Sequence, residues 1–297
     1  MSTAPSRLLW ITAAASFGFF VTQLDVTIVN VALDAVGRAF GASTAQLQWV
    51  VDAYVLALAA MLLSAGAIGD RIGPRRAFVA GLVLFGLTSA ACGFASGPLA
   101  LITARGAQGA AGALLIPPSL ALIAHAADGD ARQRAAAVGW WTAAGGVSIA
   151  AGPVLGGLLV ETLGWRWVFF VNLPVCVVGA ILTLMVAPHT PAKPKVPLDL
   201  PGQALAVGAV SLLVGGLIEG GHRGWTGAPL AALIAGLALA GGFMLFERRT
   251  PHPAIPLNVF RKRPAWTALV VGPALNFTYY GLIFVLSLYM LRALHWP

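Results

Sequence analysis

Charged residues are scarce in this sequence: they make up 9% of the 297 residues, whereas 59% are hydrophobic and the mean hydropathy is +0.85. A typical soluble domain has about 25% charged residues, so that class of protein is excluded. The few charges gather between long apolar runs, which lets each run cross the hydrocarbon core of a bilayer while its ends stay in water. The chain is therefore predicted to be an all-α polytopic membrane protein, with the lipid bilayer as its solvent.

Sites for metals, disulfides and nucleotides are also missing. The two cysteines, Cys92 and Cys176, lie inside apolar runs without CxxC or metal-ligand spacing, so we predict packing roles for both. No Gly-x-x-x-x-Gly-Lys loop is present to bind ATP phosphates, and the five histidines lie at helix ends or in loops, unlike those of a membrane-embedded enzyme. Although the net charge is +8, no soluble segment is long enough for a nucleic-acid-binding domain. We expect no enzyme activity, cofactor, metal or nucleic-acid partner.

Apolar runs of about twenty residues, bounded by charges or by Gly and Pro, predict nine transmembrane helices. These helices are predicted at residues 8–33, 46–68, 77–95, 99–124, 135–159, 166–187, 202–218, 229–246 and 265–291. Five prolines in residues 188–201 prevent a continuous helix and predict an extended linker after the sixth helix. The predicted organisation is a six-helix bundle (1–187), a linker (188–201), two further helices (202–247), a loop (248–264) and the ninth helix (265–297).

Lys and Arg collect in the loops on one side of the predicted membrane. If the N-terminus is inside, the inner loops contain residues 71–76, 132–134 and 248–263, where most of these basic residues lie. The outer side holds only Arg38, Arg166, Arg223 and Arg292. The positive-inside rule therefore predicts a cytoplasmic N-terminus.

The loop between the second and third helices combines small, acidic and basic residues. An ordinary positive-inside loop would explain its arginines, but not its glycines and aspartate together. The stretch resembles the inner-loop signature of the major facilitator superfamily, with Pro74 where that pattern often has a basic residue. The resemblance implies a conformational switch and not a substrate site. The residues that carry the switch in this reading are Gly66, Asp70, Arg71, Gly73, Arg75 and Arg76.

Three charges lie inside the predicted membrane. An arginine as deep as Arg105 costs about 2.5–3.5 kcal/mol on insertion, so it needs a partner or a watery cavity, unless its side chain reaches the outer interface. Asp25 and Asp52 lie at a similar depth, roughly 10 Å inside. We therefore predict a charge-compensated cluster in which a proton and a cationic substrate compete for one carboxylate. For Asp52, a role as a helix-start residue near the interface is equally expected.

Two stretches around these charges also resemble superfamily motifs. The stretch from Leu101 to Ala113 is similar to the fourth-helix motif, with Gln108 and Gly109 in place. Residues 24–33 resemble the first-helix motif of the fourteen-helix branch of drug:proton antiporters. The resemblance implies proton coupling by the three membrane charges.

The same resemblance implies a substrate cavity inside the bundle. Asn30 and Gln108 would line it from the first and fourth helices. The ninth helix would begin a second bundle, where Asn276 and Tyr279 either face the cavity or pack in lipid.

Small residues recur every fourth position in the fifth helix, at Ala144, Ser148, Gly152 and Gly156. They form a stripe against which another helix can pack closely. Generic packing explains part of this pattern. The spacing also resembles the antiporter signature of the superfamily, with serine where one glycine is usual, and this implies export by exchange. The signature residues are Gly139, Ser148, Gly152, Pro153, Gly156 and Gly157.

Taken together, the resemblance implies the major facilitator fold and a monomeric, proton-coupled secondary antiporter. Its partners would be protons and amphipathic or cationic drugs, or other small toxic compounds, exported across a plasma membrane of the bacterial type. Metabolite uptake is the alternative that the fifth-helix signature disfavours. The fourteen-helix pattern has five more helices after the ninth, so we expect either a fragment of a longer protein or a truncated, transport-inactive partner or regulator.

Overall fold

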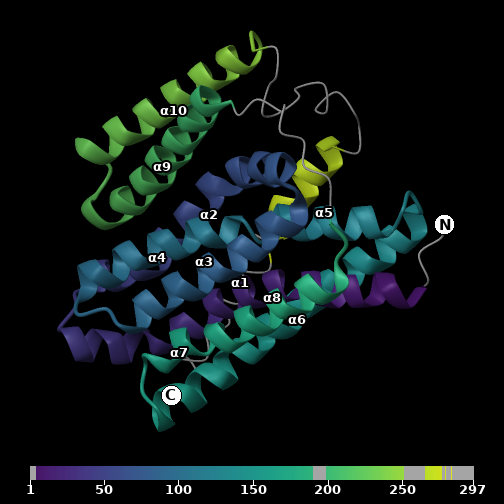
Figure 1. Ribbon diagram of the computed structural model, residues 1–297. Helices are drawn as coiled ribbons and strands as arrows, with labels where there is room; N and C mark the ends of the chain where they lie inside the picture. Colours follow the sequence, from purple (N-terminus) through teal and green to yellow (C-terminus); the bar gives the residue numbers. More distant parts are fainter. Residues whose placement is uncertain (1–4, 190–198, 251–264, 276–277, 279–281, 283–297) are drawn as a thin grey trace. The chain divides into compact units, whose positions relative to one another are not determined.

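The computed structural model describes residues 5–189, 199–250, 265–275, 278 and 282, and these residues form helices and turns without a strand (Figure 1). The chain divides into two compact units, residues 1–244 and 245–297. The helices are α1 (Pro5–Phe40), α2 (Thr44–Ile72), α3 (Pro74–Gly93), α4 (Pro98–Ala113), α5 (Ile116–Ala126), α6 (Ala131–Thr162), α7 (Trp167–Phe170), α8 (Asn172–Val186), α9 (Leu200–Arg223) and α10 (Ala228–Glu247).

The described residues contain eight helical segments that are long and apolar enough to cross a membrane, and each matches one of the first eight predicted helices. Several helices were predicted too short: α1 continues to Phe40, and α6 runs from Ala131 to Thr162. Of the predicted ninth helix, residues 265–275 are helical. The rest of that prediction falls largely outside the described residues, as do residues 190–198 and 251–264.

Two predicted helices are interrupted. The predicted helix 99–124 is divided into α4 and α5 at Leu114 and Leu115, just before Pro117 and Pro118. Proline cannot donate a backbone hydrogen bond, so it is tolerated in the first turn of a new helix but not in the middle of one. The predicted helix 166–187 is likewise divided, into α7 and α8.

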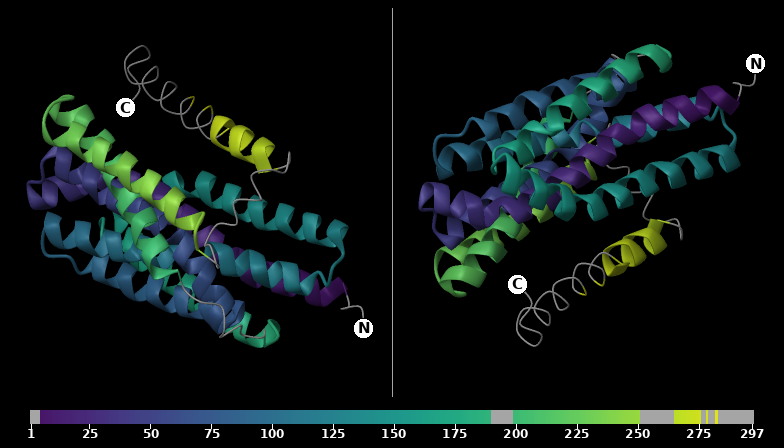
Figure 2. Two further views of the ribbon diagram at one scale, coloured as in Figure 1. Left: turned by 90° about the horizontal axis from the view of Figure 1, so that it is seen from above. Right: turned by 90° about the horizontal axis from the view of Figure 1, so that it is seen from below.

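Close helix pairs build the bundle, with α1 lying along α6 and α2 along α4 (Figure 2). Glycine permits the closest approaches. A Cβ atom on Gly109 of α4 would collide with the backbone carbonyl of Tyr54 in α2, and one on Gly152 of α6 would collide with the side chain of Thr27 in α1. These two pairs therefore have backbones nearly in contact, as small residues allow in membrane proteins.

The α9–α10 pair forms a hairpin whose turn contains two glycines with positive φ, Gly224 (86°) and Gly227 (57°). Within the hairpin, Gly216 lies against Leu233. The hairpin joins the bundle through α9, which packs on α2. The division into a six-helix bundle and two added helices remains a prediction, since residues 1–244 form one compact unit.

Two apolar core clusters fill the bundle, one near each end of its helices. The first contains Ile11 and Val21 of α1 with Phe78 and Phe85 of α3. The second contains residues further along the same helices, such as Ile28 of α1 and Cys92 of α3, together with Val50, Leu101 and Phe169. Between the two clusters, these helices present polar side chains to one another.

Candidate functional site

The guanidinium group of Arg105, on α4, is fully enclosed, since the residue has 0% of its surface exposed. Its Nη1 donates to the carboxylate of Asp25 on α1 and, at 2.7 Å, to Oε1 of Gln108. Its Nε donates to the carbonyl oxygen of Val50 on α2 at 3.0 Å, and its Cζ lies 4.3 Å from the centre of the Tyr54 ring. The side chain therefore points into the protein, which excludes in this structure the alternative that it reaches the outer interface.

The carboxylate of Asp25 is also fully buried and accepts hydrogen bonds on both oxygens. Oδ2 accepts from Arg105, while Oδ1 accepts at 2.9 Å from Nε2 of Gln108 and at 2.9 Å from Nδ2 of Asn172 on α8. Three donors thus converge on one carboxylate. Both oxygens of the buried carboxylate are therefore hydrogen-bonded, as buried polar groups usually are.

Ser89 of α3 completes the group, which we call the central polar cluster: Asp25, Ser89, Arg105, Gln108 and Asn172. The Ser89 hydroxyl oxygen accepts from Gln108 at 3.1 Å and from Asn172 at 3.0 Å, and the hydroxyl donates to the carbonyl oxygen of Phe169 at 2.9 Å. All five side chains are fully buried. Buried polar groups are tolerated when they are hydrogen-bonded to one another, and they then specify one arrangement of the helices that bear them.

The central polar cluster lies between the two apolar core clusters along α1, α3 and α4, and Asn172 begins α8, between Phe169 of α7 and Cys176. On α1, Asp25 stands between Val21 and Ile28, and on α3, Ser89 stands between Phe85 and Cys92. Apolar contacts above and below separate these charges from both ends of the bundle. A proton or ligand can reach Asp25 only if one set of those contacts opens.

Of the predicted membrane charges, the structure brings Asp25 and Arg105 together. Asp52 is half-buried on α2, two residues before Tyr54. Gln108, predicted to line the substrate cavity, lies in the central polar cluster, whereas Asn30 is exposed and its Nδ2 donates to the carbonyl oxygen of Val26. The other two residues predicted to line the cavity, Asn276 and Tyr279, lie outside the described residues.

The loop between α2 and α3 turns at Gly73, whose φ of 90° strains any residue with a side chain. Nη2 of Arg75 donates to the carbonyl oxygen of Leu184 at 2.6 Å, and its Nη1 lies 3.0 Å from Nε2 of His189, so Arg75 links the start of α3 to the end of α8. Gly66 is half-buried, next to Pro117. The remaining predicted switch residues, Asp70, Arg71 and Arg76, are exposed.

The small-residue stripe of α6 differs in one position from the predicted one. The buried positions include Gly145, Ser148, Gly152 and Gly156, whereas Ala144 is only half-buried. The helix has 3.6 residues per turn, so a straight face alternates steps of three and four. Residues spaced strictly four apart rotate gradually away from that face, so Gly145 is buried there instead of Ala144.

Signature residues of this helix differ in their surroundings. Gly156 faces Ile28 of α1, and the Ser148 hydroxyl donates to the carbonyl oxygen of Gly145 at 2.7 Å. Gly139 and Gly157 have open space where a Cβ atom would lie. Pro153 is exposed, and α6 continues through it without a break.

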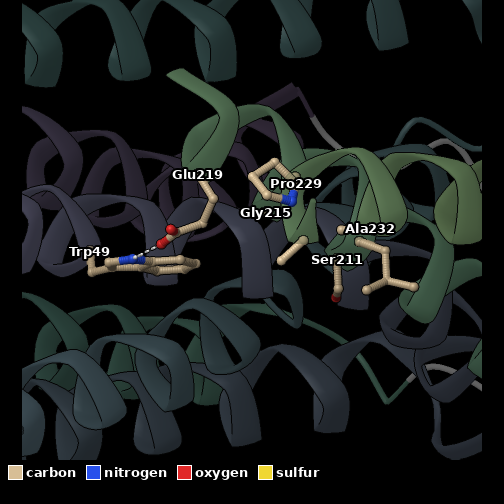
Figure 3. A pocket seen from close by; sticks show the side chains of 9 residues that line it. Trp49, Ser211, Gly215, Glu219, Pro229 and Ala232 are labelled. Carbon is tan, nitrogen blue, oxygen red and sulfur yellow. Dashed lines mark hydrogen bonds between the residues drawn. The ribbon is translucent and has the colours of Figure 1, made fainter. Parts of the chain in front are cut away.

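An open groove of about 360 Å³ lies between α2 and the α9–α10 hairpin (Figure 3). At one end, Nε1 of Trp49 donates to Oε1 of Glu219 at 3.4 Å. The rest of the wall is mostly apolar, with Gly215, Pro229 and Ala232, and it also contains Ser211. The groove can accept apolar groups from the side of the bundle, apart from the central polar cluster.

Residues such as Ser89 and Asn172 were not predicted as site residues. The only sequence signal for Asn172 is its place in the stretch Trp165–Pro174, which resembles the start of the sixth helix in the fourteen-helix branch. Ser89 carries no comparable signal, because a serine in an apolar run has little effect on hydropathy.

A comparison with protein families matches residues 15–297 to a model described as Major Facilitator Superfamily. Among curated proteins, the chain is 38% identical over 281 residues to the multidrug resistance protein Stp of Mycobacterium tuberculosis, covering 93% of this chain and 52% of Stp. It is 37% identical to the methylenomycin A resistance protein of Streptomyces coelicolor (95% and 59% covered) and 36% identical to the tetracenomycin C resistance and export protein of Streptomyces glaucescens (93% and 52% covered). The chain thus spans little more than half the length of these relatives.

Among solved structures, a peptide transporter, POT, in complex with sulfate has the same fold. The TM-score is 0.60 at 16% sequence identity, over 84% of this chain and 53% of the transporter. This likeness concerns the arrangement of the helices and not the substrate.

Proposed function

This chain belongs to the Major Facilitator Superfamily, a family of membrane transporters, and from that premise we propose that it works as a secondary antiporter. In this proposal, protons moving inward drive the export of amphipathic, often cationic compounds. The transporter lies in the plasma membrane with a cytoplasmic N-terminus and acts as a monomer. The names of the relatives, which refer to multidrug resistance, antibiotic resistance and export, support the substrate class.

The observation that carries the proposal is the fully buried ion pair of Asp25 and Arg105. Burying two charges removes their hydration, so a buried pair is rarely kept for stability alone. Inside membranes, ionisable side chains commonly mark ion and proton pathways. A carboxylate and a guanidinium on two different helices can therefore link proton binding to helix movement.

The coupling follows from charge balance. When Asp25 takes up a proton, Arg105 remains charged and loses its counter-charge, and a buried charge left without its partner costs about 3–5 kcal/mol. Opening the bundle to water on one side relieves that cost by rehydrating the guanidinium. A cationic substrate that approaches the ionised carboxylate competes with the proton for the same group, which is the simplest form of exchange.

Close packing of α1 on α6 supports the antiporter part of the proposal. Gly152 and Gly156 bring the backbone of α6 against α1 only a few residues beyond Asp25. Movement of α6 is therefore transmitted to the helix that carries the carboxylate. The loop containing Asp70 and Arg71 is proposed as the conformational switch.

The test is proton-driven dye export from proteoliposomes. Vesicles that contain the 297-residue chain receive a proton gradient and a fluorescent lipophilic cation, and uphill movement of the dye is recorded. Asp25→Asn should lose uphill transport, whereas Asp34→Asn should keep it, because Asp34 is exposed and its pair with Arg38 lies at the surface. Undiminished uphill transport by Asp25→Asn contradicts the proposal.

The same pair of variants is then compared in the product of the coding sequence that contains this chain. Export by that product, lost in its Asp25→Asn variant, supports proton coupling at this residue. Dye movement in the opposite direction would support metabolite uptake. Absence of transport in both proteins would support an inactive partner or regulator.

A further inference from the structure

Asn172 has the one buried side-chain polar atom in the central polar cluster that makes no hydrogen bond with any described residue. Its Nδ2 donates to Asp25 at 2.9 Å and to Ser89 at 3.0 Å, so both N–H groups are used. Its Oδ1 is completely buried and has no hydrogen-bond partner. Leaving such an oxygen unpaired is unfavourable, since it has been taken out of water without compensation.

The amide of Gln108 and the hydroxyl of Ser89, by contrast, have hydrogen-bond partners for all their polar atoms. Nε2 of Gln108 donates to both Asp25 and Ser89, and Oε1 of Gln108 accepts from Arg105 and from the thiol of Cys92. Ser89 accepts two hydrogen bonds and donates one. The side chains that face Asp25 thus donate to it, and a carboxylate without a proton only accepts.

A protonated Asp25 is different, because its hydroxyl group must donate. A proton on Oδ2 would face Nη1 of Arg105, which is itself a donor. A proton on Oδ1 would face the donating NH2 groups of Asn172 and Gln108. Oε1 of Gln108 cannot accept it, because that oxygen already accepts from Arg105 and Cys92. Among the described side chains of the cluster, the buried acceptor without a partner is Oδ1 of Asn172, which lies on the far side of its amide.

Turning this amide by half a turn about its last bond exchanges the places of Oδ1 and Nδ2. Because the two atoms of an amide occupy nearly equivalent positions, Oδ1 would then lie about 2.9 Å from Oδ1 of Asp25 and about 3.0 Å from Ser89. The protonated carboxyl group could donate to it, while Gln108 still donates to the hydroxyl oxygen. Ser89 still accepts from Gln108, but its hydroxyl must turn from the carbonyl oxygen of Phe169 to donate to Oδ1 of Asn172, because two acceptors would otherwise face each other.

We propose that Asn172 is a positioning residue whose amide turns when Asp25 takes up a proton. Its Nδ2 donates to the carboxylate without a proton, and its Oδ1 accepts from the protonated carboxyl group. The inference rests on the proposed function, since it assumes that Asp25 is the proton carrier. The proton comes from water on the side to which the bundle opens and returns to water on the other side. The O–H bond formed on Asp25 replaces one broken in a hydronium ion, and release of the proton to water reverses the exchange.

Other groups that face Asp25 do not replace the amide as acceptor. Arg105 from α4 donates, and Tyr54 from α2 donates its hydroxyl to the carbonyl oxygen of Thr22 at 3.3 Å. The remaining titratable groups around Asp25 are the thiols of Cys92 on α3 and Cys176 on α8. The titratable side chains of α5 and α6 are exposed near the helix ends: His125, Arg132, Arg134 and Glu161.

Infrared difference spectroscopy of the 297-residue chain in lipid nanodiscs tests the inference without requiring transport. The four asparagines of the chain carry ¹³C in the side-chain carbonyl, and spectra are compared while the pH is lowered. As the band of a protonated carboxyl group appears, the carbonyl band of one asparagine should shift to lower wavenumber, because its oxygen gains a hydrogen bond. Because the chain has ten acidic residues, the carboxyl band of Asp25 is the part of the signal that Asp25→Asn removes, and this variant should also abolish the asparagine shift.

Asn172→Leu should remove the shifted band and keep the carboxyl band, which assigns the shift to this residue. If Asn172→Leu does not fold, the comparison of wild type with Asp25→Asn still shows whether an asparagine carbonyl responds to the protonation of Asp25. A carboxyl band that appears without any asparagine shift overturns the inference and leaves proton coupling at Asp25 intact. Absence of the carboxyl band at every pH overturns both the inference and the proposed proton site.

Discussion

Replacing Asp25 by asparagine is the sharpest test of the central polar cluster, because it removes one charge and changes almost no volume. The ionised carboxylate accepts on both oxygens, from Arg105 on Oδ2 and from Gln108 and Asn172 on Oδ1. An asparagine amide has only one oxygen. In either orientation its NH2 group faces a donor, and Arg105 also loses its counter-charge.

The expected loss of stability is therefore large. Removing one partner of a buried ion pair costs about 3–5 kcal/mol, and the facing donors place Asp25→Asn toward the upper end of that range. The remaining contacts of Arg105 with Val50 and with the Tyr54 ring limit the loss. The matched control is Asp34→Asn, whose carboxylate pairs with Arg38 at the surface, where such a pair contributes about 0.2–1 kcal/mol.

The chain contains its own reporters of unfolding. Cys92 is 0% exposed and Cys176 is 3% exposed, so a thiol-reactive dye labels them only when the bundle opens. Labelling of the purified protein in detergent is followed while the temperature is raised, and the midpoints of the variants are compared with that of wild type. Asp25→Asn should be labelled at a clearly lower temperature, and Asp34→Asn close to wild type.

Equal midpoints for Asp25→Asn and wild type would refute the physical account of the cluster, since they would mean that the charge of Arg105 does not depend on Asp25. A double variant, Asp25→Asn with Arg105→Gln, adds a second criterion. It removes both charges, so it should be less destabilised than the sum of the two single changes. Additive losses would show that the two side chains do not interact.

Three further outcomes are expected. Gly109→Ala should destabilise the chain by about 1–3 kcal/mol in the same labelling assay, because the new Cβ atom meets the backbone carbonyl of Tyr54; Gly106→Ala, in the same helix with open space at its Cβ position, should be neutral or stabilise by up to about 1 kcal/mol. Gly152→Val should disrupt the packing of α6 on α1 and lower the labelling temperature, and an unchanged midpoint would contradict the close approach. Asp70→Ala, at an exposed position, should insert normally but abolish dye export, and normal export would remove the proposed switch.

Much of the fold was predictable because the membrane constrains it strongly. A segment of about twenty apolar residues has few alternatives to a spanning helix, and eight of the predicted segments are found as helices. The ends were less predictable, because α1 continues past the apolar run through Asp34 and Arg38 to Phe40. These two side chains form an ion pair on one helical face, which keeps the helix regular outside the apolar run.

The central ion pair was predictable for an energetic reason. A charge inside a membrane is costly enough that its partner must lie at the same depth, and this leads from Arg105 to Asp25. The neutral members of the cluster were not predictable in this way. Ser89 and Asn172 have a small insertion cost, so only the packed helices reveal that they meet Asp25.

The break between α4 and α5 had a visible signal in the consecutive prolines Pro117 and Pro118. Uniform hydropathy across 99–124 concealed it, since proline is itself compatible with an apolar run. Similarly, the pattern of four-residue steps suggested Ala144 for the buried face of α6, where the structure has Gly145.

The two separate apolar core clusters have a consequence for how the bundle can leak. Each cluster packs on its own, because the polar layer separates the apolar side chains of one from those of the other. In the proposed exchange cycle, one cluster can therefore open while the other stays packed. The cluster that stays packed would then keep ions from crossing while Asp25 is open to water on one side.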